Sequence, residues 1–395
     1  MATMILQRDP ADNSIACSDT DHDLAGTIRS RSPLLLAGTP PGILVSMVAT
    51  CRLHTFAFRR NLRCVLAAAL LTIGALAGAD AAEPSEETAF GSNPGNLRMF
   101  SYVPAGLAPG APLIVVLHGC KQKAATFARD AGWLALADSA MLALLLPEQK
   151  GLPRYLYDVY LFPWVVAMFG ANNQNACFNW FEPDDTVRDR GEALSIRQMI
   201  DAMIERHSVD RSRVYVVGLS AGGAMTAVML AAYPERFAGG AIVAGVPYGC
   251  ADTVTKALHC MNPGIDQEPA DWRRRVPDST GADGRVPPVS IWQGDADTRV
   301  VPRNQQELVE QWTAVHGISA TPARSERSGR MTREFYIDGA GVTRVESVLV
   351  EGLAHAFPIR TGGTPSCGQA GDFVVAAEVC AASEIARFWG LTGGN

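Results

Sequence analysis

Several common functional signatures are missing from this chain of 395 residues. It has no internal repeat, which argues against a solenoid, and neither a P-loop nor a Gly-x-Gly-x-x-Gly turn between a strand and a helix, which argues against nucleotide phosphates as ligands. Its 7 histidines are too scattered to predict a metal site. A net charge of −6 and dispersed basic residues argue against nucleic acid as a partner. We therefore expect no metal, no cofactor and no nucleic acid, while a hydrophobic content of 48% allows a sizeable core.

A hydrophobic run long enough to span a membrane is also missing. The apolar run at 65–78 falls short of the about 20 residues that a transmembrane helix needs. It follows an arginine-rich segment at 59–63 and precedes small residues at 79–81, which is typical of a secretory signal peptide. We predict that the first 81 residues are a leader, cleaved after Ala81, with the true translation start near Met47. A buried or anchoring helix is the alternative.

The consequence of such a leader is export, to the periplasm or out of the cell, with no stable membrane span after processing. The paired arginines hint at the twin-arginine route. Cysteine usage fits an oxidising compartment, because three of the nine cysteines lie in the leader and an even set of six remains. Short loops favour two disulfides and subtraction leaves the third, so the expected pairs are Cys250–Cys260, Cys367–Cys380 and Cys120–Cys177. Free buried thiols are the alternative.

The segment 218–222 reads Gly-Leu-Ser-Ala-Gly and matches the nucleophile-elbow pattern Gly-x-Ser-x-Gly. An apolar, β-branched run at 213–217 precedes it, as in a buried parallel strand, and an alanine-rich run at 224–232 follows it. A serine on such a sharp strand-to-helix turn needs small neighbours. Ser220 is therefore a candidate nucleophile, and the alternative is a glycine-rich turn that carries a serine by chance.

A nucleophilic serine needs a histidine base and an acid that orients it. In α/β-hydrolases both follow the serine, the acid first, and of the three histidines that follow Ser220, His259 comes too early to leave room for an acid. His316 ends a helix-like run, where a surface role is more typical. His355 comes just after the apolar strand 345–350, and we predict that it is the base.

The acid is expected after the buried strand 289–293, where Asp295 and Asp297 compete. An aspartate at such a turn is more often a structural cap than a catalytic group. Spacing alone does not choose between the two carboxylates.

Five segments, one of which contains the elbow, carry a resemblance to a known family. They resemble the polyhydroxybutyrate depolymerase esterase family, and more specifically the type 1 catalytic domain of short-chain-length polyhydroxyalkanoate depolymerases. The segments are Leu117–Gln122, Cys177–Phe181, Arg190–Ala193, Arg213–Met225 and Tyr233–Ala238. The resemblance covers roughly residues 90 to 392. One departure is Phe178, where the family usually has tryptophan.

The resemblance implies Ser220 as nucleophile, Asp297 as acid and His355 as base, because the family pattern Gly-x-x-Asp-x-x-Val matches 294–300. It also implies an oxyanion hole formed by the backbone N–H groups of Cys120 and Ala221. His118, in the same turn as Cys120, is interpreted as structural.

Strands and helices alternate along the rest of the chain. We predict strands at 98–103, 113–117 and 142–146, helices at 126–140 and 192–207, and a last strand and closing helix at 348–350 and 383–389, with an aromatic-rich insertion at 150–189. This order predicts an α/β-hydrolase fold, a mostly parallel sheet covered by helices on both faces, in one domain at 82–395. The loops at the carboxyl edge of the sheet then form the site.

The triad predicts ester hydrolysis through an acyl-enzyme. Trp180, Phe181 and Trp292 are candidates to line an apolar groove for a short-chain polyester, and core packing is the equal alternative. No separate substrate-binding domain is expected after the closing helix, so the predicted substrates are hydroxybutyrate oligomers, amorphous polymer or small esters. The alternatives are a feruloyl or acetylxylan esterase and, least favoured, a hydrolase-like binding scaffold without catalysis.

Overall fold

The computed structural model describes residues 5–8, 15–18, 83–156, 162–278, 285–362 and 367–393. The chain divides into two compact units, at Met1–Asp80 and Ala81–Asn395. In the first unit, β1 (Ile5–Arg8) pairs antiparallel with β2 (Ile15–Ser18). The predicted start at Met47, the signal peptide and its cleavage after Ala81 lie outside the described residues.

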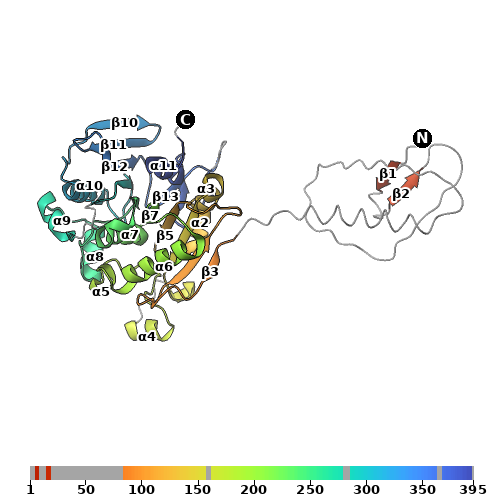
Figure 1. The fold of residues 1–395 in the computed structure, drawn as a ribbon, viewed down its shortest axis with the longest axis horizontal. Helices are drawn as coiled ribbons and strands as arrows, with labels where there is room; N and C mark the ends of the chain where they lie inside the picture. Colours follow the sequence, from red (N-terminus) through yellow and green to blue (C-terminus); the bar gives the residue numbers. More distant parts are fainter. Residues whose placement is uncertain are drawn as a thin grey trace. The chain divides into compact units, whose positions relative to one another are not determined.

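The second unit is built on a ten-stranded sheet with the order β10-β11-β12-β9-β8-β7-β5-β6-β4-β3. Figure 1 shows β10, β11 and β12 together on one side of this unit and β3 on the other. Its centre is parallel and consists of β6 (Ala143–Glu148), β5 (Leu113–Leu117), β7 (Val214–Leu219), β8 (Gly239–Val243), β9 (Val289–Gly294) and β12 (Thr343–Val350). The outer strands pair antiparallel and are β3 (Ser85–Glu87), β4 (Arg98–Tyr102), β10 (Arg324–Ser328) and β11 (Met331–Ile337). A small parallel pair, β13 (Phe357–Ile359) with β14 (Val374–Ala376), lies after β12 in the chain.

Apolar side chains fill both faces of this sheet. In β5, Leu113 and Val115 belong to one buried cluster and Ile114 and Val116 to the other, as period-two alternation requires of a strand that is covered on both sides. The first cluster includes side chains of α6 (Gly191–His207), α7 (Ala221–Ala232), α8 (Val254–Met261), α9 (Pro269–Arg275) and α10 (Arg303–His316). The second cluster includes side chains of α2 (Ala124–Asp130), α3 (Trp133–Ala140) and α11 (Ala381–Phe388).

This arrangement confirms the predicted fold: a mostly parallel sheet with helices on both faces. The long helix expected at 126–140 is wrong in one respect, because it is two helices separated at Gly132. Gly132 has a φ of 85°, and a Cβ built there would come within 3.0 Å of the carbonyl oxygen of Cys367. The chain turns at this glycine, where only its missing side chain leaves room for the Cys367 loop.

In its described residues, the insertion between β6 and α6 contains the short helices η2 (Arg154–Leu156), α4 (Pro163–Met168) and α5 (Pro183–Thr186). The three expected disulfides are present, namely Cys120–Cys177, Cys250–Cys260 and Cys367–Cys380. Within the described ranges, no helix has the length and apolar character needed to cross a membrane. In the same ranges, no group of three or more His, Cys, Asp or Glu side chains is arranged to hold a metal ion.

Candidate active site

Ser220 stands at the turn between β7 and α7. Its backbone has φ 58° and ψ −118°, a left-handed conformation that costs a non-glycine residue free energy and that clusters at functional sites. The turn is possible because the residues two before and two after the serine are glycines. A Cβ at Gly218 would lie 2.2 Å from the carbonyl oxygen of Gly222, and a Cβ at Gly222 would lie 2.2 Å from that of Leu117. The backbones of strand, helix and the neighbouring β5 turn therefore meet around the serine.

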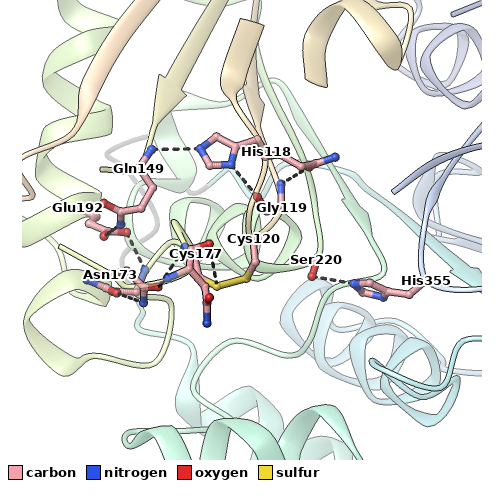
Figure 2. Close-up of a disulfide and its surroundings, with 12 residues drawn as sticks. His118, Gly119, Cys120, Gln149, Asn173, Cys177, Glu192, Ser220 and His355 are labelled. Atoms are coloured by element: carbon pink, nitrogen blue, oxygen red, sulfur yellow. Dashed lines mark hydrogen bonds between the residues drawn. A yellow bond between two sulfur atoms is a disulfide. The ribbon is translucent and has the colours of Figure 1, made fainter. Parts of the chain in front are cut away.

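The structure brings the side chains of Ser220, His355 and Asp297 into one hydrogen-bonded line. His355 Nε2 lies 2.8 Å from Ser220 Oγ, and His355 Nδ1 lies 2.7 Å from Asp297 Oδ2 (Figure 2 shows the serine–histidine contact). Asp297 follows β9 and His355 follows β12, so both reach the serine from the carboxyl edge of the parallel sheet. The imidazole is 8% exposed and the carboxylate 0%. Such a line can move a proton from the serine hydroxyl to the imidazole.

The two competing aspartates have different partners. Asp297 Oδ1 accepts hydrogen bonds from the N–H groups of Arg299 at 2.8 Å and Val300 at 3.0 Å, and its Oδ2 accepts from Gln293 Nε2 as well as facing the histidine. Asp295 Oδ1 instead accepts from the N–H of Gly352 at 2.6 Å. Asp295 therefore closes a turn, while Asp297 is the carboxylate that contacts the imidazole.

The turn after β5 lies directly against the serine. A Cβ built on Gly119 would lie 3.4 Å from Ser220 Cβ. Within the part of the chain that the structure describes, the N–H groups of Cys120 and Ala221 donate no hydrogen bond. Two unengaged amides, one in the turn beside the serine and one directly after it, are what an oxyanion hole requires. Cys120 is held by its disulfide to Cys177.

His118 holds this turn through buried hydrogen bonds. It is 0% exposed; its Nδ1 donates to the carbonyl oxygen of Gly119 at 2.7 Å and its Nε2 accepts from the N–H of Gln149 at 3.1 Å. Burial lowers the pKa of His118, because the charged imidazolium loses its hydration. A neutral imidazole satisfies both contacts, in agreement with its interpretation as a structural residue.

The prediction that Trp292 lines an apolar groove is wrong. Its side chain is 1% exposed and its indole N–H donates to Ser290 Oγ at 2.8 Å, so it lies in the core and has no surface for a substrate. Trp180 is 7% exposed and belongs to the core cluster on the α7 side of the sheet, with its ring edge-on to Phe181 at a centroid distance of 5.3 Å. Phe181 is half-buried, and its contact with substrate stays a prediction.

A different aromatic side chain lies beside the histidine. Phe373 has its ring centroid 6.0 Å from that of His355, in an edge-on arrangement, and the Arg299 guanidinium lies 5.4 Å from the same ring. The ring is half-buried, and φ is 56° at this residue. The preceding carbonyl, of Asp372, accepts from Gln122 Nε2 and so connects this loop to the turn of Cys120. Sequence reasoning missed Phe373, since no strand or motif marks its loop.

Exposed apolar side chains gather in one stretch of the insertion between β6 and α6. Trp164 is 63% exposed, Met168 78% and Phe169 57%, and the stretch 162–171 contains no charged residue. The insertion is tied to the site, because Asn175 O accepts from the N–H of Lys121 at 2.7 Å. Arg154 also pairs with Asp372 at 2.6 Å, next to Phe373.

Comparison with known proteins agrees with this geometry. The family model of esterase PHB depolymerases matches residues 97–336. Poly(3-hydroxyalkanoate) depolymerase C of Paucimonas lemoignei is 44% identical over 306 residues, which are 77% of this chain and 69% of that protein. Feruloyl esterase B of Thermothelomyces thermophilus is 30% identical over 283 residues, 70% of this chain and 89% of that protein.

Among solved structures, the acetyl xylan esterase from Aspergillus awamori superposes with a TM-score of 0.62. That match is 22% identical in sequence and covers 79% of this chain and 100% of the other, so it shows a shared fold. The fold, the family model and the relatives agree with the resemblance found in the sequence. The chain belongs to the PHB depolymerase family of esterases and is a carboxylic ester hydrolase.

Proposed function

We propose that this protein is an exported serine esterase that hydrolyses short-chain polyhydroxyalkanoate, such as poly-3-hydroxybutyrate or its oligomers, through an acyl-enzyme. The observation that carries the proposal is the contact of His355 with Ser220 at 2.8 Å and with Asp297 at 2.7 Å, at a strained elbow on the sheet edge.

In the first half of the reaction, Ser220 Oγ attacks the ester carbonyl carbon while His355 Nε2 takes the hydroxyl proton. The carbonyl oxygen becomes an oxyanion, which accepts hydrogen bonds from the N–H groups of Cys120 and Ala221. The carbon–oxygen bond to the leaving hydroxyacid end then breaks, and His355 returns its proton to that oxygen. Asp297 keeps the imidazole oriented and stabilises the imidazolium.

In the second half, water attacks the acyl-enzyme carbonyl and His355 accepts a proton from it. Collapse of the second tetrahedral intermediate expels Ser220 Oγ, which takes the proton back. The products are one carboxylic acid and one shortened hydroxyl-terminated chain.

Two observations favour a polyester over other esters. The relative that shares 44% identity is named as a poly(3-hydroxyalkanoate) depolymerase, while the feruloyl esterase shares 30%. The uncharged stretch 162–171 also presents Trp164, Met168 and Phe169 to solvent, beside the loop that adjoins the oxyanion turn. An aliphatic polyester is uncharged and apolar, so we infer that it binds along this segment.

Export is supported by the three disulfides, which form and persist in oxidising compartments. All six of these cysteines follow the predicted cleavage site. A feruloyl or acetylxylan esterase remains the second candidate, because relatives of both kinds belong to the same group of similar proteins.

The test compares four substrates with the purified protein: amorphous poly-3-hydroxybutyrate, its oligomers, a feruloyl ester and acetylated xylan. We expect 3-hydroxybutyrate release to exceed ferulate and acetate release, and Ser220→Ala to lower kcat by several powers of ten with an unchanged circular dichroism spectrum. Preferred release of ferulate or acetate would overturn the substrate, and a fully active Ser220→Ala variant would overturn the mechanism.

A further inference from the structure

A chain of buried hydrogen bonds joins the oxyanion turn to Glu192 on α6. Glu192 Oε1 accepts from Gln149 Nε2, and the N–H of Gln149 donates to His118 Nε2 at 3.1 Å. His118 Nδ1 in turn donates to the carbonyl oxygen of Gly119 at 2.7 Å. Figure 2 shows this series of contacts running from Glu192 to the residue before Cys120.

The second oxygen of the same carboxylate reaches the other side of the turn. Glu192 Oε2 accepts from the N–H of Asn179 at 2.9 Å. Asn179 lies two residues after Cys177, whose sulfur is bonded to that of Cys120. Asn173 fixes the same loop, since its Oδ1 accepts from the N–H of Cys177 at 3.2 Å. The contacts therefore close a ring, which we call the Glu192 ring: Glu192, Gln149, His118, Gly119, Cys120, Cys177 and Asn179.

The burial of the Glu192 carboxylate is unfavourable for the free energy of folding, which suggests that this group serves a function. Glu192, Gln149 and His118 are all 0% exposed, and both donors to Glu192 are neutral amides. Removing a carboxylate from water without a cationic partner is unfavourable. Burial accordingly raises the pKa of Glu192 well above its ordinary value. A methionine would fill the same volume without that cost, but it could not accept two hydrogen bonds in two directions.

We propose that Glu192 is a positioning residue for ester hydrolysis, which sets the direction of the Cys120 N–H by holding the oxyanion turn from both sides. The inference rests on the proposed function, because it needs the Cys120 amide to bind the oxyanion. An oxyanion-hole donor acts on the charge that develops in the transition state. A misdirected Cys120 amide therefore lowers kcat and leaves KM nearly unchanged.

Glu192→Gln tests this with the smallest possible change. Glutamine has one acceptor oxygen, so its NH₂ must face either Asn179 N–H or Gln149 Nε2, donor against donor. Gln149 cannot turn its amide over to compensate, because its Oε1 already accepts from the N–H of Lys150 at 2.9 Å and from Asn172 Nδ2 at 2.7 Å. We expect kcat for p-nitrophenyl butyrate to fall about tenfold to hundredfold, the range seen when reacting groups are displaced slightly, with KM within about twofold.

The double variant Gln149→Glu/Glu192→Gln supplies the rescue. The new glutamate at position 149 accepts from Lys150, from Asn172 and from the NH₂ group of the glutamine at position 192. The oxygen of that glutamine accepts from Asn179. Every hydrogen bond of the ring is therefore restored, and the carboxylate has moved from residue 192 to residue 149. We expect its kcat to return to within about threefold of the wild type, as double-variant coupling requires. If Glu192→Gln does not accumulate as folded protein, Glu192→Met takes its place. Methionine removes both hydrogen-bond acceptors, and we expect the same fall in kcat.

Glu307→Gln is the matched control. Glu307 is 1% exposed and lies between α9 and α10, where its Oε2 accepts from both Trp272 Nε1 at 2.7 Å and the N–H of Gln267 at 3.1 Å. The oxygen of a glutamine can keep both hydrogen bonds, so this variant removes a buried carboxylate away from the Glu192 ring and should leave kcat unchanged. Unchanged kcat in folded Glu192→Gln, or a double variant as slow as the single one, would overturn the inference. If wild-type protein lacks Ser220-dependent esterase activity, the proposed function fails instead.

Discussion

Asp297→Asn is the change that most directly tests how the triad works. Asp297 Oδ1 accepts from two backbone N–H groups, those of Arg299 and Val300, so the asparagine oxygen must keep that place. Its NH₂ then occupies the position of Oδ2, 2.7 Å from His355 Nδ1. Because an NH₂ group only donates, Nδ1 has to accept, and the imidazole proton moves to Nε2.

A proton on Nε2 faces Ser220 Oγ at 2.8 Å, so the imidazole can no longer take the serine's proton. In serine proteases this change of tautomer lowers kcat about 10⁴-fold. At about 1.36 kcal/mol for each factor of ten, the barrier rises by about 5 kcal/mol. The Asp297 side chain is 0% exposed and does not touch the substrate, so KM should stay within about twofold.

The assay is initial-rate hydrolysis of p-nitrophenyl butyrate by wild type, Asp297→Asn and Asp295→Asn. Asparagine at position 295 keeps an oxygen for the N–H of Gly352, so this control should retain kcat within about twofold. A folded Asp297→Asn variant that keeps more than about a tenth of wild-type kcat would refute the tautomer reasoning. A larger loss for Asp295→Asn would refute the choice of acid.

Two further predictions concern stability and polymer binding. Burial lowers the pKa of His316 from 6.5 to about 4, so the unfolded state binds more protons between these values and the free energy of unfolding should fall by about 2 kcal/mol from pH 7 to pH 5. In urea unfolding, the free energy of unfolding of His316→Gln should lack this part of the pH dependence. If the variant and the wild type depend on pH equally, the pKa of His316 is not lowered in the folded protein. Trp164→Ser with Met168→Ser should weaken adsorption to amorphous poly-3-hydroxybutyrate severalfold and leave p-nitrophenyl butyrate turnover unchanged, because both side chains are more than 60% exposed. Equal adsorption of variant and wild type would contradict the contact inferred for this segment.

The sequence is most informative where local pattern and chain order coincide. Ser220 is marked by its glycines, and His355 by its place after an apolar strand, because the carboxyl ends of parallel strands share one edge of the sheet. The hairpin of β10 and β11 was not predicted. The side chains of β10 are all exposed, so this edge strand is held by backbone pairing and its sequence has no apolar alternation.

Trp292 shows how far a residue type alone can mislead. It lies two residues before the end of β9, where successive side chains alternate between two faces that are both covered by helices. Ile291 enters one core cluster and Trp292 the other. Only residues beyond the strand end, such as Asp297, can reach the sheet edge. Strand position therefore predicts burial for Trp292, whatever the affinity of an indole for a polyester.

Glu192 represents the opposite case, a residue whose surroundings come from distant parts of the chain. Its carboxylate accepts from Gln149, which directly follows β6, and from Asn179, which lies in the insertion. Neither contact follows from helical periodicity, which only predicts that position 192 faces the sheet. A buried glutamate is uncommon enough to stand out from a helical pattern, but its partners depend on the fold and on the Cys120–Cys177 disulfide together. For this reason the sequence could place the acid beside His355, Asp297, after a particular strand. The acid that we propose orients the oxyanion turn, Glu192, could be recognised only from the structure.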